Sequence, residues 1–438
     1  MTGRTPGVPL LVEDLFRRSA GEITAVLARR AGGAGVEGAE EAVQEAFVRA
    51  LRSWPFQGVP RNPRGWLYRV AARRLADEGE KGRRRRTLLA RARAEGGGWR
   101  GAGEEAPGES AGRSGELPWR EGLPDPDRIA DDELALLLLC CDPAIPRVSQ
   151  VMLTLKVGCG FGVREIAAAF LQRPATVAQR LVRAKRLLRR RGARPPEPTT
   201  AVLVARAGAL REALYLLFTG GHAAAEGERA IRGELCGEAL RLARLLLRHP
   251  GGDEPATRAL AALFCLHGAR LPARLDPEGT PLPLDRQDRS LWDRVLLAEG
   301  FHHLEQSAGG DTLTRYHLEA AIAAVHAAAP SAEETDWEEI VALYDALLDR
   351  WPLPVVALNR AVAVGRARGP GAGLAAVAAV AEEPSLAEYH LLPATLGALH
   401  AEAGRPEEAA ASFRAALALA PSEADGRYLR HRLAELAG

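Results

Sequence analysis

The segment FLQRPATVAQRLVRAKRLLRR, residues 170–190, carries side chains whose types and spacing suit recognition of DNA. Residues 173–194 contain nine Lys and Arg and no Asp or Glu. A solvated surface helix usually balances such charge with acidic residues three or four positions away, and here there are none. Arginine and glutamine side chains match phosphates and base edges well. The segment therefore favours contact with DNA over the alternative, a surface helix on a four-helix bundle.

The same segment has the spacing of two helices joined by a short turn. Ile166, Ala167 and Phe170 lie on one side of a short first helix, and residues 171–173 form the turn. Pro174 suits the start of a second helix, because the first position needs no backbone N–H donor. Apolar residues then recur every three or four positions and predict a buried stripe of Val177, Leu181, Ala184 and Leu188. This is the spacing of a helix-turn-helix.

The side of the second helix away from this stripe carries the residues that would contact DNA. Gln179 could pair with adenine, Arg183 with guanine, and Ala175 could touch a thymine methyl group. The arginines toward the end of the helix suit phosphates, which fix position without reading sequence. The candidate set is Ala175, Thr176, Gln179, Arg180, Arg183, Arg186 and Arg190.

A second basic region lies upstream. Residues 61–100 contain 13 Lys and Arg against four Asp and Glu, a net charge of +9. A loop at 54–65, WPFQGVPRNPRG, leads into a helix expected over 62–80. Basic groups beside aromatic rings are what single-stranded DNA requires, since they combine phosphate attraction with base stacking. The candidates here are Trp54, Phe56, Arg61, Asn62, Arg64, Trp66, Arg69, Arg73 and Arg74.

The two tryptophans of this set have an alternative place in the hydrophobic core. Leu67, Val70, Ala71 and Leu75 give the helix over 62–80 an apolar stripe, and Trp54 or Trp66 could pack against it. We therefore expect the loop 55–63, rather than either tryptophan, to capture an unpaired base.

The length of 438 residues predicts two to four domains. Ala and Leu dominate and no alternating strand pattern is seen, so the fold class is all-α. Helical patterns fill 10–94 and 129–194, and residues 95–128 are rich in Gly, Glu, Pro and Ser and predict a flexible linker. A helical extension over 195–300 and repeat-like helices over 301–438 follow.

The end of the chain indicates helical repeats. Six residues of 390–421 match the tetratricopeptide pattern of ~34 residues: Leu396, Gly397, Ala409, Phe413, Ala416 and Pro421. Tyr344 and Leu347 keep the same spacing to Pro352 that Phe413 and Ala416 keep to Pro421. Repeats of this kind bind partners along a concave face and seldom catalyse reactions.

The sequence gives no sign of catalysis, a metal or a cofactor. His222, His267, His302 and His303 lack metal-ligand spacing with any Cys or carboxylate, and we find no nucleophile elbow or carboxylate pair. The five cysteines form no CxxC pair, so we expect reduced thiols packed in helices. The charged segment DRQDRSLWDR, residues 285–294, predicts a salt-bridged loop, with binding of a small ligand or partner as the alternative.

A cytoplasmic location is expected. The longest apolar run, Leu134–Cys141, has eight residues, far fewer than a membrane span needs. The first residues also lack the basic-then-apolar pattern of a leader peptide.

Residues 163–190 resemble region 4 of bacterial RNA polymerase sigma factors of the extracytoplasmic-function type. The resemblance lies in Glu165-Ile166-Ala167 of the first helix and in TVAQRLVRAK, residues 176–185, of the second. Residues 131–158 resemble the opening helices of the same domain in a subgroup with a long helical C-terminal extension. Within the extension, 214–224 and 285–300 are the most similar parts. The resemblance implies that 129–194 reads the −35 promoter element.

The N-terminal part of this sequence resembles region 2 of the same family. Residues 39–55, AEEAVQEAFVRALRSWP, are similar to the helix that docks on the polymerase clamp, and 62–80 to the helix that contacts the −10 element. The resemblance implies polymerase contacts from Glu40, Glu41, Gln44, Glu45 and Phe47.

The resulting prediction is an alternative sigma factor, which is not an enzyme. Its partners would be core RNA polymerase and promoter DNA, with no membrane, and the extension after 195 would regulate it, for instance through a protein partner. One alternative is a helix-turn-helix regulator with a repeat-type effector domain, which binds duplex DNA without polymerase. The other is a repeat-type adaptor or enzyme whose basic helix is incidental.

Overall fold

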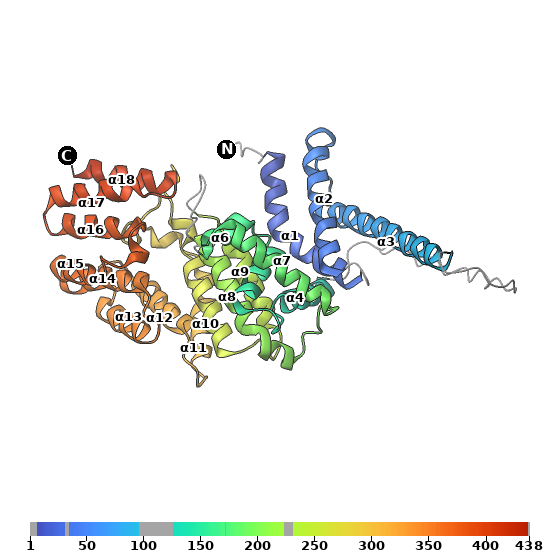
Figure 1. Ribbon diagram of the computed structural model, residues 1–438. Coiled ribbons are helices and arrows are strands. Elements are labelled where there is room, and N and C mark those ends of the chain that lie inside the picture. The colour runs from blue at the N-terminus through green and yellow to red at the C-terminus, as the bar shows by residue number, and fades with distance from the viewer. Residues whose placement is uncertain (1–6, 31–34, 96–125, 171, 223–230, 437–438) are drawn as a thin grey trace. The chain divides into compact units, whose positions relative to one another are not determined.

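The structure is a computed structural model that describes residues 7–30, 35–95, 126–170, 172–222 and 231–436 (Figure 1). These residues form eighteen α-helices, and they contain no β-strand beyond an isolated bridge between Leu275 and Pro281. The predicted all-α fold class is confirmed. Most of the predicted linker, residues 96–125, lies outside the described residues. Within the described part, no helix combines the length and the apolar character that crossing a bilayer would require.

Three long helices begin the chain: α1 (Val8–Arg30), α2 (Gly35–Gln57) and α3 (Pro63–Glu95). Their facing sides bury a common core that includes Ile23, Val26, Leu67 and Tyr68. Arg30 donates a hydrogen bond of 2.6 Å to the Tyr68 hydroxyl, which ties the end of α1 to α3. The helix α3 continues 15 residues past the predicted end at 80, since the Arg- and Ala-rich sequence that follows has high helix propensity.

Four helices then follow: α4 (Pro126–Cys140), α5 (Arg147–Val157), α6 (Val163–Ala169) and α7 (Pro174–Arg190). The apolar run Leu134–Cys141 is buried throughout. The buried amide of Gln150 donates to the carbonyl oxygens of Asp142 and Ile145, at 3.0 and 2.8 Å. These bonds satisfy the backbone of the turn between α4 and α5 and fix the angle at which α5 leaves it.

The chain divides into two compact units, residues 1–213 and 214–438, and the boundary falls inside α8 (Thr200–His222). The end of region 4 at residue 194 stays a prediction from the sequence. The first half of α8 packs with the preceding helices: Arg206 donates to the Leu138 carbonyl oxygen at 2.8 Å and pairs with Asp142. Arg147 and Glu212 add a second ion pair at 3.0 Å.

The second unit begins with the rest of α8, α9 (Gly233–Leu247), α10 (Pro255–Gly268) and α11 (Arg294–Ser307). Residues 259–266 of α10 are all buried, so α10 is the central helix of this part. Between α10 and α11 the chain makes three short 3₁₀ turns, Leu271–Ala273, Leu284–Arg286 and Arg289–Leu291.

A series of antiparallel helix hairpins completes the chain (Figure 1). It consists of α12 (Arg315–Ala328), α13 (Trp337–Arg350), α14 (Pro354–Arg368), α15 (Pro370–Ala378), α16 (Leu391–Glu402), α17 (Pro406–Ala418) and α18 (Glu423–Glu435), with a 3₁₀ turn at Pro384–Leu386. A side chain at Gly397 would place its Cβ 2.7 Å from the ring of the buried Phe413, so a glycine is needed for α16 and α17 to pack this closely.

All five cysteines are buried. Burial raises the pKa of Cys141 to about 11 and the pKa values of Cys236 and Cys265 to about 12. These thiols therefore stay protonated at neutral pH, which agrees with the expected packing role.

Buried histidines should make the second unit sensitive to acid. Burial and the nearby Arg270, Arg274 and His326 lower the pKa of His267 to about 3. An unfolded histidine binds a proton near pH 6.5, so between pH 6.5 and 3 the unfolded chain holds more protons than the folded one. The free energy of unfolding should therefore decrease as the pH is lowered across this window, by about 1.4 kcal/mol per pH unit for such a histidine.

Urea unfolding between pH 7 and 5 tests this expectation. His267→Gln should make the decline shallower by the contribution of one histidine, while the exposed His302→Gln serves as control and should leave it unchanged. An identical decrease of the free energy of unfolding in wild type, His267→Gln and His302→Gln would contradict the account.

Candidate nucleic-acid and polymerase interface

The helices α6 and α7 form a helix-turn-helix. The Glu165 carboxylate accepts a hydrogen bond of 2.7 Å from the Gly162 backbone N–H and caps the start of α6. Pro174 is the first residue of α7, as its lack of an N–H predicted. The residues of the predicted stripe, Val177, Leu181, Ala184 and Leu188, are all buried. The stripe fixes which side of α7 is turned outward.

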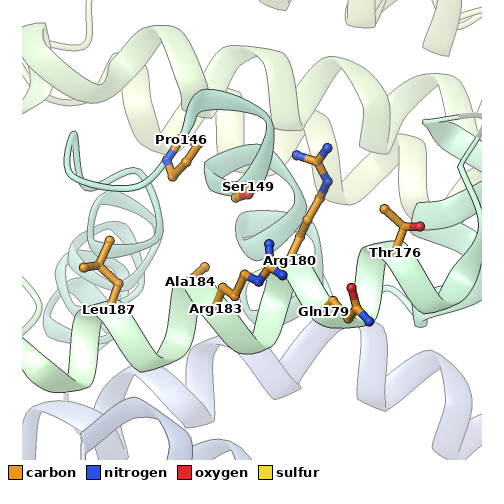
Figure 2. Close-up of a pocket in the computed structure, with 8 residues that line it drawn as sticks. All are labelled: Pro146, Ser149, Thr176, Gln179, Arg180, Arg183, Ala184 and Leu187. Carbon is orange, nitrogen blue, oxygen red and sulfur yellow. The ribbon is translucent and has the colours of Figure 1, made fainter.

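The outward side of α7 carries the residues predicted to read DNA. Those that are exposed are Ala175, Thr176, Gln179, Arg183, Arg186 and Arg190, and Arg180 is half-buried. Figure 2 shows Thr176, Gln179, Arg180 and Arg183 lining a groove with Pro146 and Ser149 at the start of α5. The groove has a volume of about 330 Å³. Neither Arg180 nor Arg183 forms an ion pair with any residue that the structure describes, so both guanidinium groups keep their donors for a ligand.

Two other basic residues of α7 form ion pairs with acidic residues of α2. The Lys185 ammonium lies 2.5 Å from a carboxylate oxygen of Glu40, and Arg189 pairs with Glu37. A third ion pair, Arg17 of α1 with Glu165 of α6, joins the same two groups of helices at 3.0 Å. The basic charge of α7 is therefore divided between an outward side and a side held against α2.

The last turn of α2 presents an aromatic side chain to solvent, next to the loop that leads to α3. Phe56 is 89% exposed, the largest exposure of any large apolar residue that the structure describes. Arg61 and Asn62 are also exposed. The Asn62 side-chain oxygen accepts a hydrogen bond of 2.9 Å from the Gly65 N–H and caps α3, so this part of its hydrogen-bonding capacity is structural.

The two tryptophans of this region differ from Phe56. Trp54 is 2% exposed and belongs to the core, with its ring edge-on to the half-buried Trp66 at 5.4 Å. The prediction that Trp54 contacts DNA is therefore wrong for this structure, because its ring is enclosed by α1, α2 and α3. Phe56 is exposed, but it lies in the last turn of α2 and not in a loop, because α2 continues through residues 55–57 of the loop expected over 55–63.

The arginines along α3 fall into two groups. Arg69 and Arg73 are exposed and have no ion-pair partner in the described part of the chain. Arg64 pairs with Glu22, and Arg74 pairs with Glu45 and Glu78, both at 2.7 Å. Among the four arginines of α3 in the predicted set, Arg69 and Arg73 are consequently more available to phosphates than Arg64 and Arg74.

The helix α2 has an outward side next to its core side. Glu41 and Glu45 are exposed and Gln44 is half-buried, as a contact surface requires. Glu40 is buried under Lys185, and Phe47 is 4% exposed with its ring 5.0 Å from Phe16. The prediction of polymerase contacts is therefore wrong for Glu40 and Phe47 in this structure, since both side chains face other helices.

Two apolar residues on this outward side were not predicted. Val48 and Leu51 are each 44% exposed and share a face of α2 with Glu41 and Gln44. The signal was present in the sequence, because both positions lie off the stripe Val43, Phe47, Ala50 and Trp54 that repeats every three or four residues. Exposed apolar side chains among acidic ones are typical of a protein-binding surface.

Comparisons with known proteins identify the family of the N-terminal helices. Residues 15–86 match the family model Sigma-70 region 2, and residues 206–308 match a family of unknown function, DUF6596. The uncharacterized protein R00370 of Rhizobium meliloti (strain 1021) is 38% identical over 400 residues, which cover 91% of this chain and 90% of that protein. No solved structure matches the chain. The chain therefore belongs to the same family as this Rhizobium protein, and its N-terminal helices are a sigma-70 region 2, a domain that binds core RNA polymerase and promoter DNA.

Proposed function

We propose that the chain is an alternative sigma factor of the extracytoplasmic-function type, which binds core RNA polymerase and selects promoters. Region 2, residues 10–94, would dock on the polymerase clamp and open the −10 element. Region 4, residues 129–194, would read the −35 element through α7. Polymerase performs the chemistry, and this chain determines where it begins.

The observation that carries the proposal is the exposure of Phe56 beside arginines that lack acidic partners. An aromatic ring in water at 89% exposure contributes nothing to the core, but it can stack on an unpaired base. Arg61, Arg69 and Arg73 supply positive charge nearby in the sequence for the backbone of the same strand. A regulator that binds only duplex DNA has no use for such an exposed ring.

The assignment of α7 rests on the division of its charge. Gln179 and Arg183 face outward in the first three turns, where a recognition helix meets base edges. Arg186 and Arg190 continue the outward side and suit phosphates. Lys185 and Arg189, which pair with α2, are left out of this proposed contact.

Binding to core polymerase tests the proposal. Val48→Asp places a charge in the apolar part of the proposed docking surface and should weaken binding of the full chain to core polymerase about tenfold or more, on the order of 1.4 kcal/mol. Val295→Asp, a change at an exposed valine of α11, is the matched control and should bind normally. Unaltered binding by Val48→Asp would remove this surface from the proposal, and a chain that binds duplex DNA but not polymerase would be a helix-turn-helix regulator.

We further propose that the extension regulates the sigma domains and that α16 and α17 form a tetratricopeptide-like unit. The contact of Gly397 with Phe413 supports this assignment, because both positions belong to the repeat pattern. A chain ending at His222 keeps α8, whose first half packs with the sigma domains. Its promoter-dependent transcription should differ from that of the full chain, provided that circular dichroism shows folded helices. Equal output and equal regulation from both would contradict a regulatory role.

A further inference from the structure

Six basic side chains converge inside the second unit. They are His222 at the end of α8, His267 in the last turn of α10, Arg270 and Arg274 on either side of the 3₁₀ turn that follows, Arg289 in the turn before Trp292, and His326 in α12. We call them the Arg–His cluster. The charged segment 285–294 thus contributes a residue to the interior as well as ion pairs to the surface.

The cluster is arranged around a buried tryptophan. Trp292 is 4% exposed, and the guanidinium carbons of Arg289 and Arg270 lie 4.5 and 5.6 Å from the centre of its ring. The rings of His222 and His267 meet edge-on at 4.9 Å. A ring attracts a cation over its face, but two cations on one ring also repel each other.

The hydrogen bonds of these arginines go to uncharged acceptors. Arg270 donates to the Gln287 side-chain oxygen at 3.3 Å, and Arg274 to the His222 carbonyl oxygen at 2.7 Å. Arg289 donates to the carbonyl oxygens of His326 and Ala329, at 2.8 and 2.7 Å. These bonds position the guanidinium groups without compensating their charge.

No carboxylate of the described residues forms an ion pair with the arginines of the cluster, and the exposed Glu333 attracts Arg289 only from a longer distance. None of Arg270, Arg274 and Arg289 forms an ion pair with a described carboxylate, whereas Arg286 in the same segment pairs with Glu435 at 2.7 Å. Burial together with repulsion from Arg274 and Arg289 lowers the pKa of Arg270 to about 10. Buried charges are costly unless a charge of opposite sign accompanies them.

Unused hydrogen-bonding atoms gather at the same place. Five buried nitrogens of these residues have no hydrogen-bond partner within the part of the chain that the structure describes: Arg289 Nη2, Trp292 Nε1, His222 Nε2, His267 Nδ1 and His326 Nδ1. Proteins leave few buried polar atoms unsatisfied, so five in one cluster indicate an absent acceptor. Neutral histidines, the tryptophan and the arginine can all donate to it.

We infer that the Arg–His cluster binds a small oxyanion, a phosphate or carboxylate group, which supplies the missing negative charge and accepts these hydrogen bonds. Planar guanidinium groups match the paired oxygens of such an anion. Ser290 and Leu291, the two residues before the buried Trp292, are exposed, so the segment that carries Arg289 reaches the surface. The inference does not depend on the proposed promoter recognition.

Calorimetric titration of the full chain in a low-ionic-strength buffer tests the inference, with inorganic phosphate and succinate as probes. At least one probe should bind saturably with one site per chain. Preference for phosphate would identify a phosphoryl ligand, and preference for succinate a carboxylate ligand. Arg270→Gln should weaken binding at least tenfold, while Arg294→Gln, a change at an exposed arginine of the same segment, should leave it unchanged.

A second variant covers the case in which Arg270→Gln does not fold. Arg289→Lys keeps the charge but loses the planar group, and it should weaken binding of the same probe about tenfold. Equal affinity in wild type and Arg289→Lys, or no saturable binding of either probe to wild type, would overturn the inference. Weak binding that Arg294→Gln reduces as much as Arg270→Gln would show an adventitious ion only.

Discussion

Replacing Phe56 by alanine should slow the opening of promoter DNA by about 5- to 150-fold, because base–aromatic stacking contributes ~1–3 kcal/mol per base. The side chain is 89% exposed, so its removal takes nothing from the core, and the thermal unfolding of the chain should be unchanged. The measurement is the rate of opening by the reconstituted holoenzyme, followed by 2-aminopurine fluorescence in the −10 element of a selected promoter.

The control for this variant is Phe301→Ala, which removes another exposed phenylalanine outside region 2. It should open promoters at the wild-type rate. The affinity of Phe56→Ala for core polymerase should also be normal, since Phe56 lies in the last turn of α2, more than one turn beyond Val48 and Leu51. Opening at the wild-type rate by Phe56→Ala would exclude Phe56 as the base-capturing side chain.

Arg183→Ala should remove ~1–3 kcal/mol of binding free energy at one base pair of the −35 element. Arg183 is exposed on α7, lines the groove beside Gln179, and has no ion-pair partner among the residues described. Competition binding of holoenzyme to a set of single-base promoter variants measures the effect. Wild type should discriminate at the affected position, and Arg183→Ala should bind all four bases there about equally.

Arg186→Ala is the matched comparison on the same helix. As a phosphate contact, Arg186 should contribute equally on every sequence, and its loss should reduce the slope of log affinity against log salt concentration by about one. If Arg183→Ala also lost affinity equally on all sequences, Arg183 would be a phosphate contact and not a reader of bases.

Much of α7 could be predicted because the relevant signals are local. Pro174 marks the start of the helix, and the spacing of Val177, Leu181, Ala184 and Leu188 defines its buried side. Residues off that stripe are exposed as a matter of helix geometry. The exposure of Phe56 follows from its position in the last turn of α2, off the core stripe that ends at Trp54.

The predictions that failed concern contacts between distant parts of the sequence. Glu40 looks like any acidic residue on a surface helix, and only the position of α7 shows that Lys185, 145 residues later, covers it. Phe47 could have been placed correctly, since it repeats the spacing of Val43 and Ala50. The Arg–His cluster could not, because its members are spread from 222 to 326 and come together only when α8, α10 and α12 pack.

The domain boundary illustrates the same limit. The Pro-rich stretch at 191–200 has the composition of a linker, yet α8 begins at Thr200 and its first half packs against the helices that precede it. Arg206 makes this attachment specific through Asp142 and the Leu138 carbonyl oxygen. Composition identifies where a helix ends, but packing decides to which unit the next helix belongs.

Transcription with purified components tests the central claim most directly. Core RNA polymerase, the full chain and a library of promoter fragments would be combined, and the start sites of the transcripts would be mapped. A sigma factor should produce discrete start sites that appear only when the chain is present, with transcript yields that fall in Phe56→Ala and Val48→Asp. Start sites that do not depend on the chain, together with duplex binding that needs no polymerase, would contradict the assignment.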